Sequence, residues 1–158
     1  MDNTFVAKKM GEVLAFCNVG ADTFELGRAA LSEKYGADFV QTRESKFKSS
    51  AELLTRLFMN DAMRETGLTK ANATGEKLTK LRDIYVGDEW DNAVELSEWS
   101  GFFEGAGRVH WELVRGVATS LKNDELASLA DNWIEDHKSF LDLASATLKT
   151  VGTERAAL

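Results

Sequence analysis

Residues 90–121 read WDNAVELSEWSGFFEGAGRVHWELVRGVATSL, and this stretch decides the fold. Its apolar residues recur every three or four positions, which is the spacing of one face of an α-helix. The same spacing continues after a short polar break in residues 124–150, DELASLADNWIEDHKSFLDLASATLKT. The two segments therefore predict two long amphipathic helices joined by a tight turn. The residues of the first helix that we expect to face the core are Leu96, Trp99, Phe102, Phe103, Ala106, Val109, Leu113, Val114 and Val117.

Two further long helices are predicted upstream, because the chain contains no proline and shows no strict two-residue alternation of a strand. We expect the first over residues 4–35, ended by Gly36, and the second over residues 38–66, capped by Asp38 and ended by Gly67. The segment 68–89 mixes glycine, asparagine and threonine with a short apolar pattern. It is typical of a connection that carries one small helix at about 75–85.

The lengths of the connections predict the topology. Two tight helical hairpins joined by one long connection are typical of an all-α four-helix bundle with a crossover, in which helices 38–66 and 90–121 run parallel. An up-down-up-down bundle is the alternative. The 158 residues are enough for one domain with a core of its own.

Composition narrows the class of protein. The formal net charge of −7 argues against nucleic acid or an anionic membrane surface as the partner, since both require a basic footprint. No apolar run approaches the ~18 residues of a membrane span. A lone cysteine, Cys17, and the lack of a secretory signal pattern lead us to expect a cytoplasmic protein.

The order of the helices and the cluster Glu135-Asp136-His137 on the last one make the chain resemble the ferritin-like superfamily. The likeness in layout extends over about residues 5–150, and that in residue pattern only over 90–150. The resemblance implies metal binding in the core of the bundle. However, the Glu-x-x-His pairs of a ferritin-like di-metal site are missing, because Ile134 precedes His137 by three positions and Gly107 precedes His110 by three.

Polar residues on otherwise apolar helix faces indicate a mixed site of carboxylates and imidazoles. Counting residues back from each turn places Asp61, Glu65, His110 and His137 at one level of the crossover bundle. Two histidines and two carboxylates suit a divalent transition metal, Fe, Mn or Zn, and could support redox chemistry. The alternative is a metal-free core in which the carboxylates hold the histidines by hydrogen bonds.

The same counting predicts a second polar group, made of Arg28, Arg43 and Glu95, near the other end. Opposite charges at one level are typical of a structural ion-pair cluster, and an anionic-ligand pocket is the less frequent alternative.

A second function hypothesis is a non-catalytic protein that acts by forming a homo-oligomer or by binding a partner. Ser97, Gly101 and Gly105 line one edge of helix 90–121, where small side chains allow tight packing or a subunit interface. Trp111, expected on the polar side, is a candidate interface anchor, whereas Cys17 is expected to act as a small core hydrophobe. No phosphate loop, nucleophile elbow or zinc motif appears, so the sequence leaves open whether the protein is an enzyme.

Overall fold

The structure, a computed structural model, describes all residues 1–158 and contains six α-helices and no strand. The helices are α1 Asn3–Leu26, α2 Arg28–Tyr35, α3 Ala37–Leu57, α4 Asp61–Val86, α5 Ala93–Leu121 and α6 Asp124–Ala156. The predicted all-α class is confirmed. The predicted four-helix bundle is not, because the segment expected to be a connection is itself a long helix, α4.

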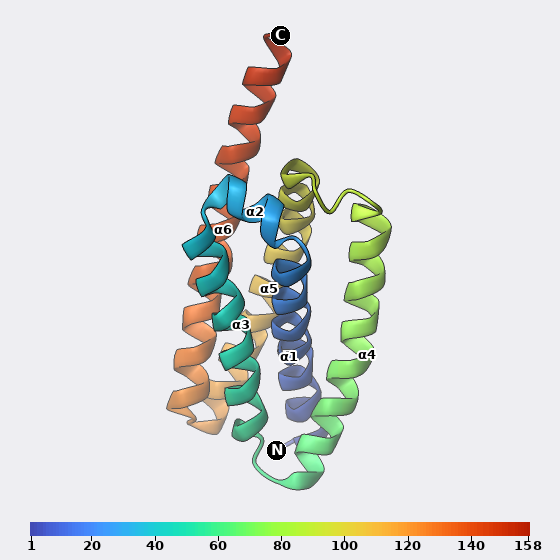
Figure 1. Ribbon diagram of the computed structural model, residues 1–158. Coiled ribbons are helices and arrows are strands. Elements are labelled where there is room, and N and C mark those ends of the chain that lie inside the picture. The colour runs from blue at the N-terminus through green and yellow to red at the C-terminus, as the bar shows by residue number, and fades with distance from the viewer.

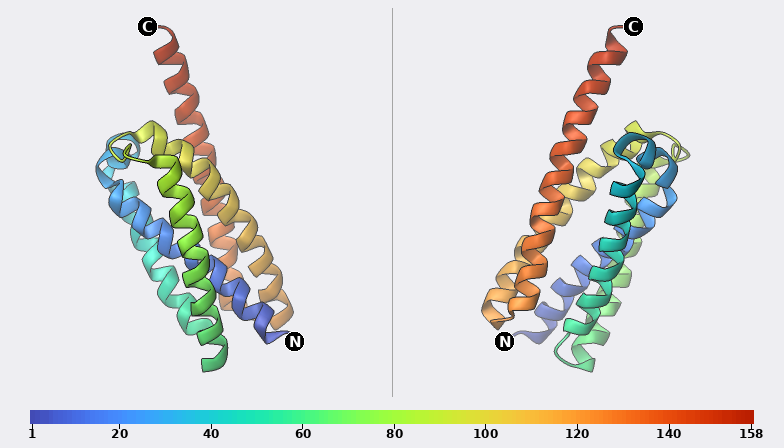
Figure 2. Two further views of the ribbon diagram at one scale, coloured as in Figure 1. Left: turned by 90° about the vertical axis from the view of Figure 1, so that its right-hand side faces the viewer. Right: turned by 60° about the vertical axis from the view of Figure 1, so that its left-hand side comes forward.

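The long helices stand side by side, and the short α2 crosses one end of the bundle (Figure 1). Helix α1 lies at the centre and packs against α3, α4 and α5, while α6 packs mainly against α5. Helices α3 and α5 run in the same direction, since α4 carries the chain back between them. The last turns of α6 project beyond the other helices (Figure 2).

The expected helix 4–35 is broken at Gly27 into α1 and α2. The Gly27 backbone, at φ −92° and ψ 12°, leaves the helical region, and glycine is among the residues that hold a helix least firmly. The bend lets α2 cross the end of the bundle instead of extending α1 past it.

The expected helix 38–66 is also wrong, because α3 ends at Leu57 and a new helix begins at Asp61. Asn60 caps this new helix by accepting a hydrogen bond from the Met63 backbone N–H at 2.9 Å. Gly67 does not end a helix. It lies inside α4 against α1, where a Cβ on Gly11 would lie 2.3 Å from the Gly67 carbonyl oxygen. The glycines therefore allow close backbone packing of α1 on α4.

Helices α5 and α6 form the predicted hairpin, with the turn at Lys122 in the left-handed region at φ 52°. Asn92 and Asn123 cap the two helices through their side-chain oxygens. Helix α5 begins at Ala93, three residues later than expected, and α6 continues to Ala156 beyond the expected end at Thr150. None of the six helices combines the length and the apolar character that crossing a bilayer requires.

Candidate functional site

The four predicted metal ligands do not meet. Asp61 is 96% exposed at the start of α4, where it pairs with Arg64 at 2.7 Å. Glu65 is also exposed on α4. His110 is half-buried, and His137 is fully buried. No three histidine, cysteine, aspartate or glutamate side chains come together as a metal would require, so this set does not fit a Fe, Mn or Zn site.

The two histidines have different partners instead of facing each other. His110 Nδ1 donates to the Ala106 carbonyl oxygen at 2.7 Å, and its ring packs on Phe16 with centroids 4.9 Å apart. His137 Nδ1 hydrogen-bonds Glu104, a buried carboxylate of α5. Counting residues from the turns placed these four side chains at one level wrongly, for two reasons. Asp61 and Glu65 lie on α4 and not on α3, and α5 is rotated about its axis relative to the expected orientation.

Glu104 is the centre of a buried polar network that links three helices. Its Oε2 accepts a hydrogen bond from Arg43 Nη2 on α3 at 2.7 Å, as well as the bond with His137 on α6. Arg43 Nη2 also lies 2.8 Å from Asp136 Oδ1, and Lys46 Nζ donates to Asp136 Oδ2 at 2.9 Å. Glu104 is only 1% exposed and Arg43 only 3%. Two carboxylates and two cations compensate one another, as burial of charge requires.

Aromatic rings enclose the Arg43 guanidinium. Its carbon lies 4.5 Å from the ring centroid of Phe140, 5.1 Å from that of Phe47 and 5.3 Å from that of Phe24. These distances allow cation–π attraction. Gly107 leaves room for the His137 imidazole, since a Cβ there would lie 2.7 Å from the ring. Because its charges are paired and aromatic rings surround Arg43, the network holds α3, α5 and α6 against one another.

The predicted cluster of Arg28, Arg43 and Glu95 is wrong. Arg28 pairs with Glu44 at 2.9 Å, whereas Arg43 belongs to the buried network. Glu95 is partly exposed and takes part in no ion pair. A hydrogen bond from Lys48, with a further one from Arg28, lowers the pKa of Glu44 despite its burial.

Helix α5 is apolar on two faces, and its expected core face is confirmed only in part. Phe102, Val109 and Leu113 are exposed. The expected core residues that are buried are Leu96, Trp99, Phe103, Val114 and Val117. Trp111, expected on the polar side, is fully buried and stacks on Trp133 with centroids 6.4 Å apart. Ser97 is buried too and meets the Tyr35 hydroxyl at 2.6 Å. A signal was present, because small, aromatic and aliphatic residues recur at helical spacing around Glu104. The buried residues of α5 are Leu96, Ser97, Trp99, Ser100, Phe103, Glu104, Gly107, Trp111, Val114, Val117 and Ala118.

The second apolar face of α5 is left in solvent. Phe102 is 61% exposed and Val109 is 62% exposed, and Leu113 continues the same line. Gly105 lies between Phe102 and Val109, and Gly116 follows Leu113; at both glycines nothing lies within 4 Å of the position of a Cβ. We call these five residues the α5 stripe.

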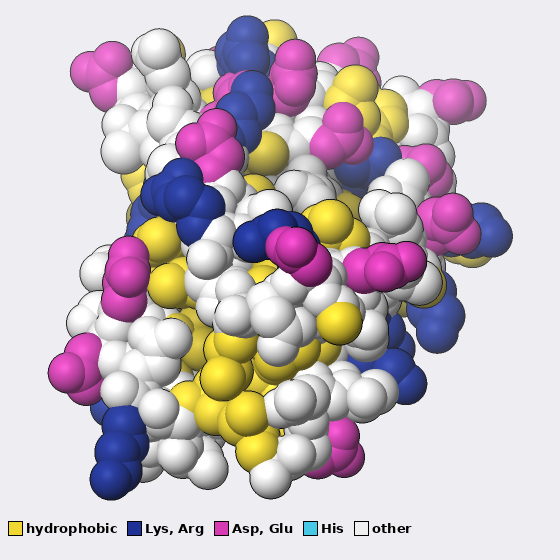
Figure 3. Space-filling model, turned by 90° about the horizontal axis from the view of Figure 1, so that it is seen from below, with side chains coloured by type: hydrophobic (Ala, Val, Ile, Leu, Met, Phe, Trp, Pro, Cys, Tyr) yellow, Lys and Arg dark blue, Asp and Glu magenta, His cyan; other side chains and the backbone are white.

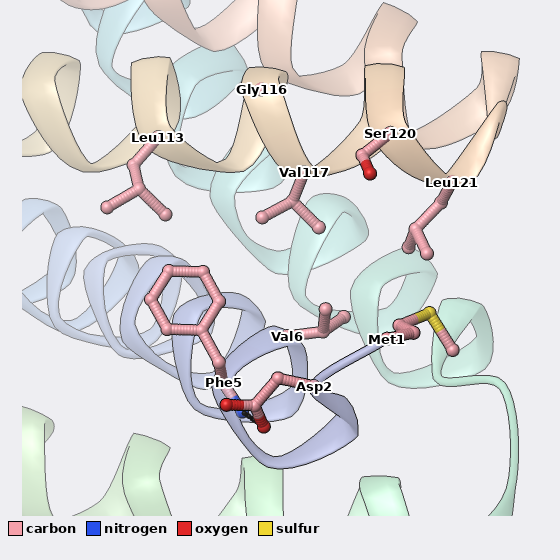
Figure 4. A pocket seen from close by; sticks show the side chains of 9 residues that line it. All are labelled: Met1, Asp2, Phe5, Val6, Leu113, Gly116, Val117, Ser120 and Leu121. Atoms are coloured by element: carbon pink, nitrogen blue, oxygen red, sulfur yellow. Dashed lines mark hydrogen bonds between the residues drawn. The ribbon is translucent and has the colours of Figure 1, made fainter.

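Two hollows border the α5 stripe. The upper hollow, of about 290 Å³, lies between α4 and α5 and is lined only by apolar residues. They are Leu78, Leu81, Ile84, Tyr85, Trp99, Phe102, Phe103 and Ala106. The lower hollow, of about 560 Å³, lies between the start of α1 and the end of α5. Phe5, Val6 and Met1 face Leu113, Val117 and Leu121 across it (Figure 4).

The hollows and the stripe make one apolar surface, which we call the α4–α5 surface. The lower hollow lies at the end of the bundle that holds the N-terminus, and apolar side chains gather in one area of that end (Figure 3). Ile84, at the edge of the upper hollow, is 83% exposed. An exposed contiguous apolar area of this kind is typical of a site that binds another protein, a membrane or an apolar ligand.

Comparisons of the chain with models of protein families, with curated proteins and with solved structures give no significant match.

Proposed function

We propose that this protein is a non-catalytic binding protein that recognises a helix of another protein subunit along the α4–α5 surface. The observation that carries the proposal is that α5 is apolar on two faces and buries only one of them. A surface helix with no partner has a polar outer face. An apolar helix face is complementary to this surface, because the upper hollow is lined only by hydrophobic side chains.

The shape of the surface supports a helix laid lengthwise. The α5 stripe runs from Phe102 to Gly116, which is about 21 Å at 1.5 Å per residue. Glycines in the stripe let a second backbone approach closely, while Phe102 and Ile84 offer the large apolar contacts that dominate binding energy. By contrast, the buried network of Glu104, Arg43 and His137 is closed to solvent and serves stability.

A labelled amphipathic helix tests this proposal. The probe is a 20-residue peptide with leucine at helical spacing and lysine elsewhere, titrated by fluorescence anisotropy at protein concentrations where the chain sediments as a monomer. Replacing Ile84 by Asp removes a contact worth about 1.5 kcal/mol or more, so the dissociation constant should rise about tenfold.

Leu143→Asp is the matched control, since Leu143 is an exposed leucine on α6 and the substitution adds the same charge. A scrambled peptide of the same composition controls for the attraction between a cationic peptide and an acidic protein. Equal weakening by Ile84→Asp and Leu143→Asp would show that the peptide does not use the α4–α5 surface and would overturn the proposal.

A further inference from the structure

We infer that the partner on the α4–α5 surface is a second copy of this chain, whose α5 packs antiparallel to the first about a two-fold axis at Val109. The inference rests on the proposed function and names the partner of that same surface. It follows from the order of large and small residues along the α5 stripe, from the positions of the two hollows and from the area available.

The α5 stripe is self-complementary. In an antiparallel pair of α5 helices centred on Val109, a residue that stands a given number of positions before Val109 in one copy lies level with the residue that stands the same number of positions after Val109 in the other copy. Phe102 precedes Val109 by seven positions, and Gly116 follows by seven. Gly105 precedes it by four, and Leu113 follows by four. Phe102 and Leu113 thus each lie level with a glycine of the second copy, which gives space for interdigitation, while the two Val109 side chains meet at the axis.

The same axis brings the two hollows together. The α5 residues of the upper hollow, from Trp99 to Ala106, precede Val109 by three to ten positions. Those of the lower hollow, from Leu113 to Leu121, follow it by four to twelve. Both hollows open on the side of α5 that faces α1 and α4. The two-fold axis therefore sets the upper hollow of each copy against the lower hollow of the other, and both are closed at once.

Charge and area are compatible with this pairing. None of the five residues of the α5 stripe is charged. Glu98, which precedes the stripe, stands eleven positions before Val109 and therefore lies level with the uncharged Ser120 of the other copy, eleven positions after it. No like charges are therefore opposed along the stripe. The exposed apolar side chains of the surface offer on the order of 500 Å² per copy, more than half of the ~800 Å² that each partner of a standard interface contributes.

Cysteine crosslinking tests the axis. Packed helices 8–10 Å apart, with Cα atoms about 2.3 Å from each axis, bring facing Cα atoms to about 4–5 Å, within reach of a disulfide. Val109→Cys should therefore form a covalent dimer under mild oxidation. Leu113→Cys alone should not, because its two copies lie about 12 Å apart along the axis. A mixture of Gly105→Cys and Leu113→Cys chains should crosslink again. The native Cys17 is buried and does not interfere.

Sedimentation equilibrium supplies the second readout. The wild-type chain should approach twice its 17.5 kDa mass as its concentration rises. Val109→Asp, at a solvent-exposed position that leaves the fold intact, opposes two carboxylates and should raise the dimer dissociation constant about 100-fold or more. Gly105→Leu should weaken the dimer, and the double variant Gly105→Leu with Leu113→Gly should restore it, since large and small residues exchange places.

Two outcomes would overturn the inference: a chain that stays monomeric at all concentrations, or crosslinks that form equally at residues 109 and 113. A monomer that still binds the amphipathic probe through Ile84 would overturn the dimer alone and leave the proposed binding function standing. A monomer that binds no probe would overturn both.

Discussion

Replacing Glu104 by Leu should destabilise the protein strongly, because it removes the carboxylate that Arg43 and His137 share. The Glu104 oxygen accepts from both, and Arg43 is left with Asp136 as its remaining carboxylate. Removing one partner of a buried ion pair costs about 3–5 kcal/mol, since the other charge stays desolvated. For a chain of this size each kcal/mol corresponds to roughly 2–4 °C, so the Tm should fall by about 6–20 °C.

Urea unfolding followed by circular dichroism measures this loss, and Glu95→Ala is the matched control on the same helix. Glu95 is partly exposed and unpaired, so its substitution should change the free energy of unfolding by no more than about 0.5 kcal/mol. The double variant of Arg43→Met with Glu104→Leu should recover part of the loss, because no charge is then left uncompensated. A Glu104→Leu variant as stable as Glu95→Ala would refute the reasoning.

Two further predictions concern packing and pH. Gly11→Ala should lower the free energy of unfolding by about 1–3 kcal/mol, because the added Cβ would lie 2.3 Å from the Gly67 carbonyl oxygen and would push α1 away from α4. A gain in stability, as alanine gives in an uncrowded helix, would contradict this prediction. The hydrogen bonds that Lys48 and Arg28 donate to Glu44 lower the pKa of Glu44 in the folded state. Ionised Glu44 therefore adds to the free energy of unfolding at pH values above the ordinary carboxyl range, and this addition is lost as the pH falls through the lowered pKa. The stability difference between wild type and Glu44→Gln should therefore shrink below about pH 4 in denaturant titrations, and a difference that grows there would show the wrong sign.

Local signals made the helices predictable. The three-to-four residue spacing and the asparagine and lysine at the turn placed the α5–α6 hairpin within three residues at its start. Of the helix boundaries that involve a glycine, the expected end at Gly36 is confirmed, because α2 ends at Tyr35 with Gly36 as its C-cap, but two others were predicted wrongly. Gly27 breaks a helix that was expected to continue, and Gly67 lies inside a helix that was expected to end. A glycine only lowers the cost of a break, and the neighbouring helices decide whether one occurs.

The sequence by itself determined that this protein is all helical and that α5 carries more apolar surface than one face needs, because residue spacing and propensity act within a helix. Only the tertiary structure decided which face of α5 is buried. Trp111 and Phe102 are both large and aromatic, and they lie on opposite faces of the helix. The choice came from contacts between helices distant in sequence: Trp133 stacks on Trp111, and His137 enters the space at Gly107 to reach Glu104. These contacts turn Glu104 inward and leave Phe102 and Val109 in solvent, because the energy of burying a side chain depends on the partner that covers it, and that partner is set by the fold.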